Sequence, residues 1–316
     1  MKEITAGRLK SLGSVLIPVA LCFAVLLGPE YWVQLAIGIV ISAILGLSWD
    51  ILGRGGLVSF GQAAFFGIGA YASAILGEHM TQVLAWVLAI CLCGVVAAAL
   101  GYVTIRLSGI YFAIATLGFT LGMQVVVIAA KPLTGGSGGI APPLVGDGDP
   151  KIQLVVAAVC LLIALIVSWS LLTQRIRPAI FMLRGDAELA AASGVPVVRT
   201  RCGLFAVSGM LAGLAGALYG SLYGYIVPTD VFTLAFSVVA VAAAVLGGTD
   251  RIAGAVLGAV ALRLIESSSQ DLIGGSGYSV VYGVIIIVVV LIAPGGLWGL
   301  GEQFVRRLRF GRGREG

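Results

Sequence analysis

The polar residues that could do chemistry fall into two groups, and the first is the segment 174–201, which separates two long apolar stretches and holds five arginines. Asp186 can accept the first backbone N–H groups of a helix over residues 187–193, most of which are good helix formers. Gly194 can end that helix, and Pro196 prevents its continuation. A short capped helix within a basic segment can bind another protein or can simply connect two membrane spans, and both interpretations stay open.

The second group consists of small polar side chains inside the apolar stretches. A polar group in lipid is costly unless it faces protein or water, so such residues are candidates to line a passage for a solute. Ser59 and Gln62 are three residues apart and share one face of a glycine-rich, interrupted segment. Hydrogen bonding between helices for packing is the alternative for each of them. The candidates are Ser59, Gln62, Ser73, Tyr111, Thr116 and Gln124.

No group of residues in the sequence has the spacing of a catalytic or metal site. The single histidine, His79, adjoins Glu78 in a short turn, and the five cysteines lack the spacing of metal ligands or of a disulfide framework. No Gly-Lys-Ser/Thr sequence for binding phosphate follows the glycine-rich stretch 134–139 or occurs elsewhere. We therefore expect neither an enzyme nor a cofactor-binding chain.

The composition is that of a membrane protein. Hydrophobic residues make up 59% of the chain and charged residues 10%, with a mean hydropathy of +1.10. In a soluble globular protein, roughly a quarter of the residues are charged. We predict an all-α polytopic membrane protein with about ten transmembrane helices, of which the third, eighth and ninth can be broken or re-entrant. The expected spans lie near 12–28, 31–49, 57–77, 82–105, 107–129, 152–173, 203–226, 231–248, 252–266 and 278–293.

The basic residues orient these spans. With the amino terminus in the cytoplasm, nearly all Lys and Arg fall inside, except Lys131 and Lys151 in an outer loop over 130–151. This is the bias of the positive-inside rule, and it places both termini and the loop 174–201 in the cytoplasm. The whole chain, 1–316, is expected to be a single membrane domain. Its net charge of +5 is explained by contact with anionic lipid headgroups and requires no nucleic acid.

Charged residues are expected at the span ends only, with none in the middle third of a span. Asp50 and Arg54 are four residues apart near a cytoplasmic end, which favours a local ion pair. Arg263 and Glu266, three apart, are expected to pair on a helix surface near the outer edge. The absence of a central charge argues against a carrier driven by an ion gradient, although it does not exclude sodium held by backbone groups.

Glycine is abundant, with 46 residues. Small residues four apart let membrane helices approach closely, so their number predicts a tightly packed bundle. The glycines at this spacing are Gly216, Gly220 and Gly224, then Gly209 with Gly213, Gly118 with Gly122, and Gly254 with Gly258.

Several further stretches follow one another along the chain: residues 46–76, the sequences RLSGIYFAIATLGF (106–119) and LTGGSGGI (133–140), the segment 174–201, and the sequences FAVSGMLAGLAGALY (205–219) and LGGTDRIAGAVLG (246–258). In order and spacing these stretches, spread from about residue 45 to 298, resemble the LivM-type permeases of branched-chain amino acid ABC importers. One departure is Gln62, which stands where many relatives have histidine.

The resemblance implies a permease subunit in the bacterial inner membrane that imports branched-chain amino acids. It implies a LivH-like second permease, two ATPase subunits that bind ATP and Mg, and an extracytoplasmic substrate-binding protein that delivers the small-molecule substrate. Relatives import urea, short amides or aromatic acids, so these solutes remain alternatives, as does a stand-alone secondary carrier or channel. By the same likeness, the segment around 186–195 is a coupling helix that seats in an ATPase subunit. Its candidate residues are Asp186, Glu188, Ala190, Ala191, Gly194 and Arg199.

Overall fold

The described part of the chain is almost entirely helical in the computed structural model, which covers 28–104, 107, 109–171, 176–249, 252–273 and a few isolated positions. The only β-bridge in these ranges joins Ile140 to Ile226. The helices are α2 (Glu30–Arg54), α3 (Gln62–Gly77), α4 (Gln82–Val103), α5 (Ile110–Ala129), α6 (Lys131–Thr134), α7 (Pro150–Leu171), α8 (Arg177–Gly185), α9 (Ala187–Ala192), α10 (Val197–Tyr223), α11 (Pro228–Val231), α12 (Leu234–Gly247) and α13 (Ile252–Ile273), with short 3-10 turns η1 (Gly136–Gly138) and η2 (Val145–Gly148).

The predicted fold class is confirmed, although the number of spans is not. Within the described residues, seven helices are long and apolar enough to cross a membrane, and α3 is a shorter apolar helix of 16 residues. These eight match the second to ninth expected spans. The first and last, 12–28 and 278–293, lie largely outside the described residues. The ninth span is longer than expected, because α13 continues to Ile273.

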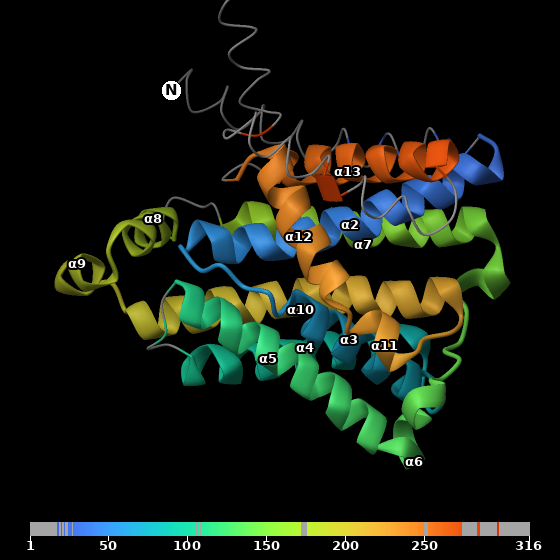
Figure 1. Ribbon diagram of the computed structural model, residues 1–316, viewed down its shortest axis with the longest axis horizontal. Helices are drawn as coiled ribbons and strands as arrows, with labels where there is room; N and C mark the ends of the chain where they lie inside the picture. Colours follow the sequence, from blue (N-terminus) through green and yellow to red (C-terminus); the bar gives the residue numbers. More distant parts are fainter. Residues whose placement is uncertain are drawn as a thin grey trace, which may run out of the picture.

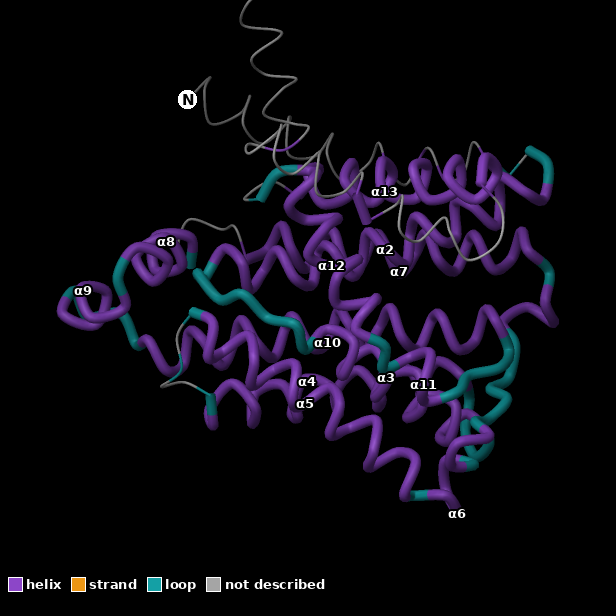
Figure 2. The backbone as a smooth tube through the Cα atoms, viewed as in Figure 1, coloured by secondary structure: helices purple, strands orange, loops and turns teal. Residues whose placement is uncertain are grey.

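Most of the long helices run roughly parallel (Figure 1), as expected for a membrane bundle. Helices α2, α7 and α13 pack together in one half, and α3, α4, α5 and α10 in the other. Helix α12 runs steeply between the halves and contacts α2, α3 and α13. Helices α8 and α9 protrude at one end, and the loops around α6 lie at the opposite end (Figures 1 and 2).

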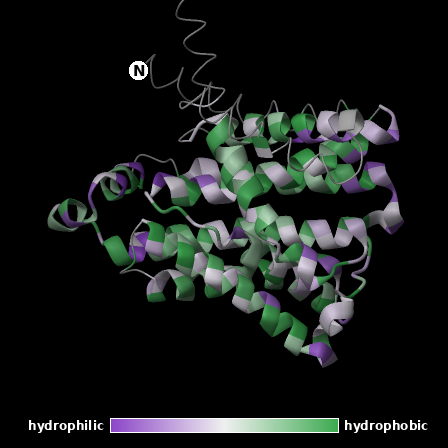
Figure 3. Cartoon of the chain, in the orientation of Figure 1, coloured by the Kyte–Doolittle hydropathy of each residue, from purple (hydrophilic) through white to green (hydrophobic). Residues whose placement is uncertain are grey.

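Helix α2 lies at the centre of the described bundle. It contacts α7, α10, α12 and α13, and its most hydrophobic stretch is 89% buried. A helix that is apolar all round can be covered by lipid or by other helices, and α2 is covered by helices. In contrast, only 28% of the corresponding stretch of α4 and 22% of that of α5 are buried. Their outer faces are apolar (Figure 3), as suits contact with lipid or another membrane subunit.

Glycines bring several helix backbones into direct contact, as predicted. A Cβ on Gly216 would lie 1.9 Å from the carbonyl oxygen of Phe66, and one on Gly69 would lie 2.2 Å from that of Gly213. These contacts join α3 to α10. A Cβ on Gly258 would lie 1.9 Å from the carbonyl oxygen of Ala243, which joins α12 to α13. No side chain larger than hydrogen fits at these crossings.

Two predicted glycine contacts are wrong. A Cβ on Gly118 or on Gly122 would meet nothing within 4 Å, because both glycines lie on the exposed face of α5. Gly224 does not mediate a helix crossing either, since it ends α10 with a φ of +68°. A four-residue spacing identifies a small-residue face, but only the bundle decides whether that face meets another helix.

Candidate functional site

Helices α8 and α9 form an elbow, 176–196, at one end of the bundle, within the basic segment 174–201. The predicted short helix is confirmed as α9: the Asp186 Oδ1 accepts the backbone N–H of Glu188 at 2.8 Å and that of Leu189 at 3.2 Å. Gly194 adopts a φ of +84°, which terminates the helix as expected. Helix α8 was not predicted, although its strongly amphipathic sequence, with Arg177 and Arg184 among apolar residues, is a signal that could have revealed it.

The elbow buries one face and exposes another. Ile180, Leu183 and Ala190 are buried, while the side chains of Phe181 and Leu189 are 76% and 68% exposed. Large apolar side chains on a polar, exposed element are typical of a surface that binds another protein. Of the six coupling candidates, Ala190 is buried, and the exposed five are Asp186, Glu188, Ala191, Gly194 and Arg199.

The elbow touches the end of α2 through backbone atoms. Gly56 follows α2 with a φ of +76°, and a Cβ there would lie 3.2 Å from the Cα of Arg184. A Cβ on Gly55 would lie 2.9 Å from a methyl carbon of Leu204 on α10. The turn after α2 is therefore held between α8 and α10. Nearby, the buried Asp50 and Arg54 form the predicted ion pair.

The segment 57–61 after this turn is not helical, and it runs inside the helical body to the start of α3 (Figure 2). This confirms the expected interruption of the third span. Backbone N–H and C=O groups buried inside a membrane protein need hydrogen-bond partners, and here side chains provide them. The Trp49 Nε1–H donates to the carbonyl of Ser59 at 2.9 Å, and the Phe60 N–H donates to Thr116 Oγ1 at 3.0 Å. The Ser237 hydroxyl donates to the carbonyl of Phe60 at 2.7 Å.

Gln62, the first residue of α3, lies in a closed polar cluster. Ser48 and Ser208 exchange hydrogen bonds, each hydroxyl donating to the other's carbonyl, at 2.9 Å and 2.8 Å. Both hydroxyls can then only accept, and the Gln62 amide nitrogen lies 3.0 Å from Ser208 Oγ and 3.4 Å from Ser48 Oγ. This arrangement fixes the orientation of the amide. Its Oε1 is buried without a hydrogen-bond partner among the described residues.

The six passage candidates divide by location. Ser59, Gln62, Ser73 and Thr116 are buried and hydrogen-bonded, and of these four side chains only that of Gln62, bonded to Ser208, joins two helices among the described residues. Tyr111 is 70% exposed and Gln124 is half-buried on α5. In this conformation, only these two reach the surface of the bundle.

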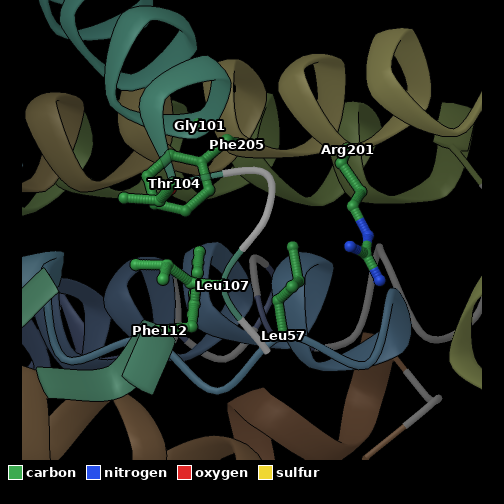
Figure 4. Close-up of a pocket in the computed structure, with 7 residues that line it drawn as sticks. All are labelled: Leu57, Gly101, Thr104, Leu107, Phe112, Arg201 and Phe205. Carbon is green, nitrogen blue, oxygen red and sulfur yellow. The ribbon is translucent and has the colours of Figure 1, made fainter. Parts of the chain in front are cut away.

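A small apolar cavity lies beside the beginning of the interrupted segment. Its volume is about 10 Å³, too small for a solute. Figure 4 shows the Arg201 side chain extending from α10 toward the end of α2, at one side of this space. The cavity is lined by Leu57, Gly101, Thr104, Leu107, Phe112, Arg201 and Phe205.

One prediction about charge is wrong. Arg263 and Glu266 form the expected pair, at 2.9 Å, but they lie near the middle of α13, because that helix is longer than its apolar sequence suggests. The Arg263 Nε–H also reaches α2, at 2.9 Å from Ser42 Oγ and 3.2 Å from the carbonyl of Gly38. A central ion pair therefore exists within the span array. No cluster of three or more potential metal ligands occurs in the described part of the chain.

Comparison with known proteins identifies the family. Residues 31–292 match the family model described as "Branched-chain amino acid transport system / permease component". The chain belongs to this family. It is therefore a multi-pass membrane protein and the permease component of an ABC importer, and the resemblance noted from its motifs is confirmed.

Individual relatives of this permease agree with the family assignment. The LivM proteins of the high-affinity branched-chain amino acid transport systems of Salmonella typhimurium and Escherichia coli are each 29% identical over 300 residues, which cover 84% of this chain and 69% of theirs. The ribose import permease protein RbsC of Bacillus subtilis is 25% identical over 188 residues, or 57% of each chain. No solved structure matches the chain significantly.

Proposed function

We propose that this permease imports branched-chain amino acids through the bacterial inner membrane, driven by ATP hydrolysis in partner subunits that bind its elbow. The observation that carries the proposal is the elbow itself. It is a capped helix pair that exposes Phe181 and Leu189 outside the bundle and contacts the α2 end through its backbone. The sequence has no phosphate-binding motif of its own, so the nucleotide and its Mg would be bound by the partners.

The proposed assembly contains a LivH-like second permease, two ATPase subunits and an extracytoplasmic substrate-binding protein. The exposed, apolar outer faces of α4 and α5 can accommodate a second membrane subunit as well as lipid. The elbow would lie in the cytoplasm, which places both termini there and the loop 130–151 outside, in accord with the distribution of Lys and Arg. No feature of this arrangement requires nucleic acid.

The substrate proposal rests on the relatives with the broadest coverage, both of which are named for branched-chain amino acid transport. The similarity to a ribose import permease favours a second candidate, the same machinery carrying another small solute. A binding screen with the cognate substrate-binding protein separates the two. Tight binding of leucine, isoleucine or valine is expected. Failure to bind them, together with tight binding of urea, an amide, an aromatic acid or a sugar, would reject the substrate and leave the importer class intact.

A stand-alone carrier is the other class of function, and the central Arg263–Glu266 pair is the observation in its favour. The test is transport by purified components in liposomes. We expect leucine uptake only when the second permease, both ATPase subunits, the binding protein and ATP are present. Uptake by the isolated chain, driven by a sodium or proton gradient, would overturn the proposal.

A further inference from the structure

The start of α3 depends on a side chain from another helix. Ser237, the fourth residue of α12, donates its hydroxyl hydrogen to the carbonyl of Phe60 at 2.7 Å and accepts the N–H of Ala63 at 3.0 Å. In a helical turn, the N–H of the third residue on would bond to that carbonyl directly. The hydroxyl is thus inserted where a backbone hydrogen bond would otherwise form. Helix α3 begins at Gln62, two residues after Phe60, whose carbonyl is bonded in this way.

Helix α5 holds the same residue from the other side. Thr116 Oγ1 accepts the N–H of Phe60 at 3.0 Å and donates its own hydrogen to the carbonyl of Ala113 at 2.9 Å. The Thr120 hydroxyl lies 3.3 Å from the carbonyl of Phe60. Phe60 therefore has its backbone groups bonded to α5 and α12 and not to its own helix. The carbonyl of Phe60 can instead form a helical hydrogen bond with a residue that follows it in α3.

The other end of the interrupted segment meets the elbow. The turn at Gly55 and Gly56 is confined between Leu204 and the backbone of Arg184, which an added Cβ would approach to 2.9 Å and 3.2 Å. A displacement of α8 toward α2 must therefore move or bend this turn. Segment 57–61 directly joins this turn, which contacts the elbow, to the start of α3.

Helix α12 is in turn firmly packed. A Cβ on Gly247 would lie 1.6 Å from the carbonyl oxygen of Gly254 on α13, and one on Gly46 of α2 would lie 2.9 Å from the Cβ of Ala243. With backbones this close, α12 moves together with α2 and α13 and not independently of them. The position of the Ser237 hydroxyl relative to α3 therefore depends on how the two halves of the bundle are placed relative to each other.

We propose that Ser237 is a positioning residue of the transport cycle, whose hydroxyl keeps segment 57–61 extended in this state and releases it when the halves of the bundle shift. On release, Phe60 pairs with Ala63 and α3 gains helical length at its amino end. The shortening of the segment then links elbow movement to movement of α3. This inference rests on the proposed function, since it requires partners that move the elbow.

The test compares two side chains of nearly the same shape at position 237 in the complete importer, reconstituted in liposomes with its partner subunits. Ser237→Thr keeps the hydroxyl and Ser237→Val lacks it, and both add the same bulk at a fully buried site. We measure leucine imported per ATP hydrolysed. The Thr variant should keep the wild-type ratio, and the Val variant should show a ratio about tenfold lower, with ATP still hydrolysed.

Ser168→Ala on α7 is the matched control, because this seryl hydroxyl is buried without a hydrogen-bond partner among the described residues. It should leave the ratio unchanged. Equal ratios for the Thr and Val variants would overturn the inference. So would loss of assembled complex in the Val variant alone, because the hydroxyl would then serve folding and not coupling. If the wild-type complex itself shows no ATP-dependent uptake, the proposed function fails instead.

Discussion

Arg263 donates from Nη1 to Glu266 Oε2 at 2.9 Å, one turn apart near the middle of α13. The same guanidinium reaches α2, where the absence of a side chain on Gly38 leaves room for it. Both side chains are about one quarter exposed, at 26% and 22%. Arg263 thus joins α13 to α2 within a candidate membrane span, where an unpaired charge would be expensive.

Removing one charge of this pair should destabilise the permease more than removing both. In Glu266→Gln the arginine keeps its charge without a counter-charge, and we expect a loss of about 2 kcal/mol. In the double variant Arg263→Met/Glu266→Met both charges are absent, so most of the loss should be recovered. Thermal unfolding of the purified protein in detergent measures both. A double variant less stable than Glu266→Gln would show that the contacts of Arg263 with α2 dominate.

Apolar contact at the elbow is predicted to bind the ATPase subunit. Leu189→Asp places a charge on a side chain that is 68% exposed, so folding should be unaffected while the ATPase subunit no longer copurifies. Leu133→Asp is the control, since Leu133 is 63% exposed at the opposite end of the molecule. If the ATPase subunit copurifies equally well with both variants, its binding surface lies outside the elbow.

The cap of α9 should contribute to the same binding. Asp186→Ala removes the acceptor of two backbone N–H groups, which costs about 1 kcal/mol and corresponds to about fivefold weaker binding of the ATPase subunit. Asp186→Asn retains a capping oxygen, so its affinity should stay close to the wild-type value. Titration of the ATPase subunit onto the permease in nanodiscs measures the difference. If the Asn and Ala variants are weakened equally, the charge of Asp186 matters and not the cap.

The glycine contacts provide a test of packing with identical substitutions. Gly216→Ala forces a methyl group to within 1.9 Å of the carbonyl oxygen of Phe66, so α3 and α10 must separate, at a cost of about 3 kcal/mol. Gly122→Ala meets nothing within 4 Å and improves helix propensity, so stability should hold or rise slightly. Melting temperatures in detergent compare the two. Equal destabilisation would mean that the exposed face of α5 packs against another subunit.

The sequence by itself determined the features that depend on local chemistry. Apolar length predicted the helices, Asp186 and Gly194 predicted the limits of α9, and the glycine-rich start of the third span predicted its interruption. Each follows from residues close together in the chain. The motifs also identified the family, since their order and spacing need no coordinates.

Only the tertiary structure decided which residues meet across the bundle. Gln62 lies in a cluster with Ser48 and Ser208, which are 14 and 146 residues away in the sequence, and Ser237 completes the start of α3. The true length of α13 brought Arg263 to mid-helix, where apolar runs had placed it at an edge. Likewise Gly118 and Gly122 lack neighbours despite their spacing. Helix packing fixes these relationships, because in lipid the partner of a polar or small residue is chosen by geometry and not by its neighbours in the chain.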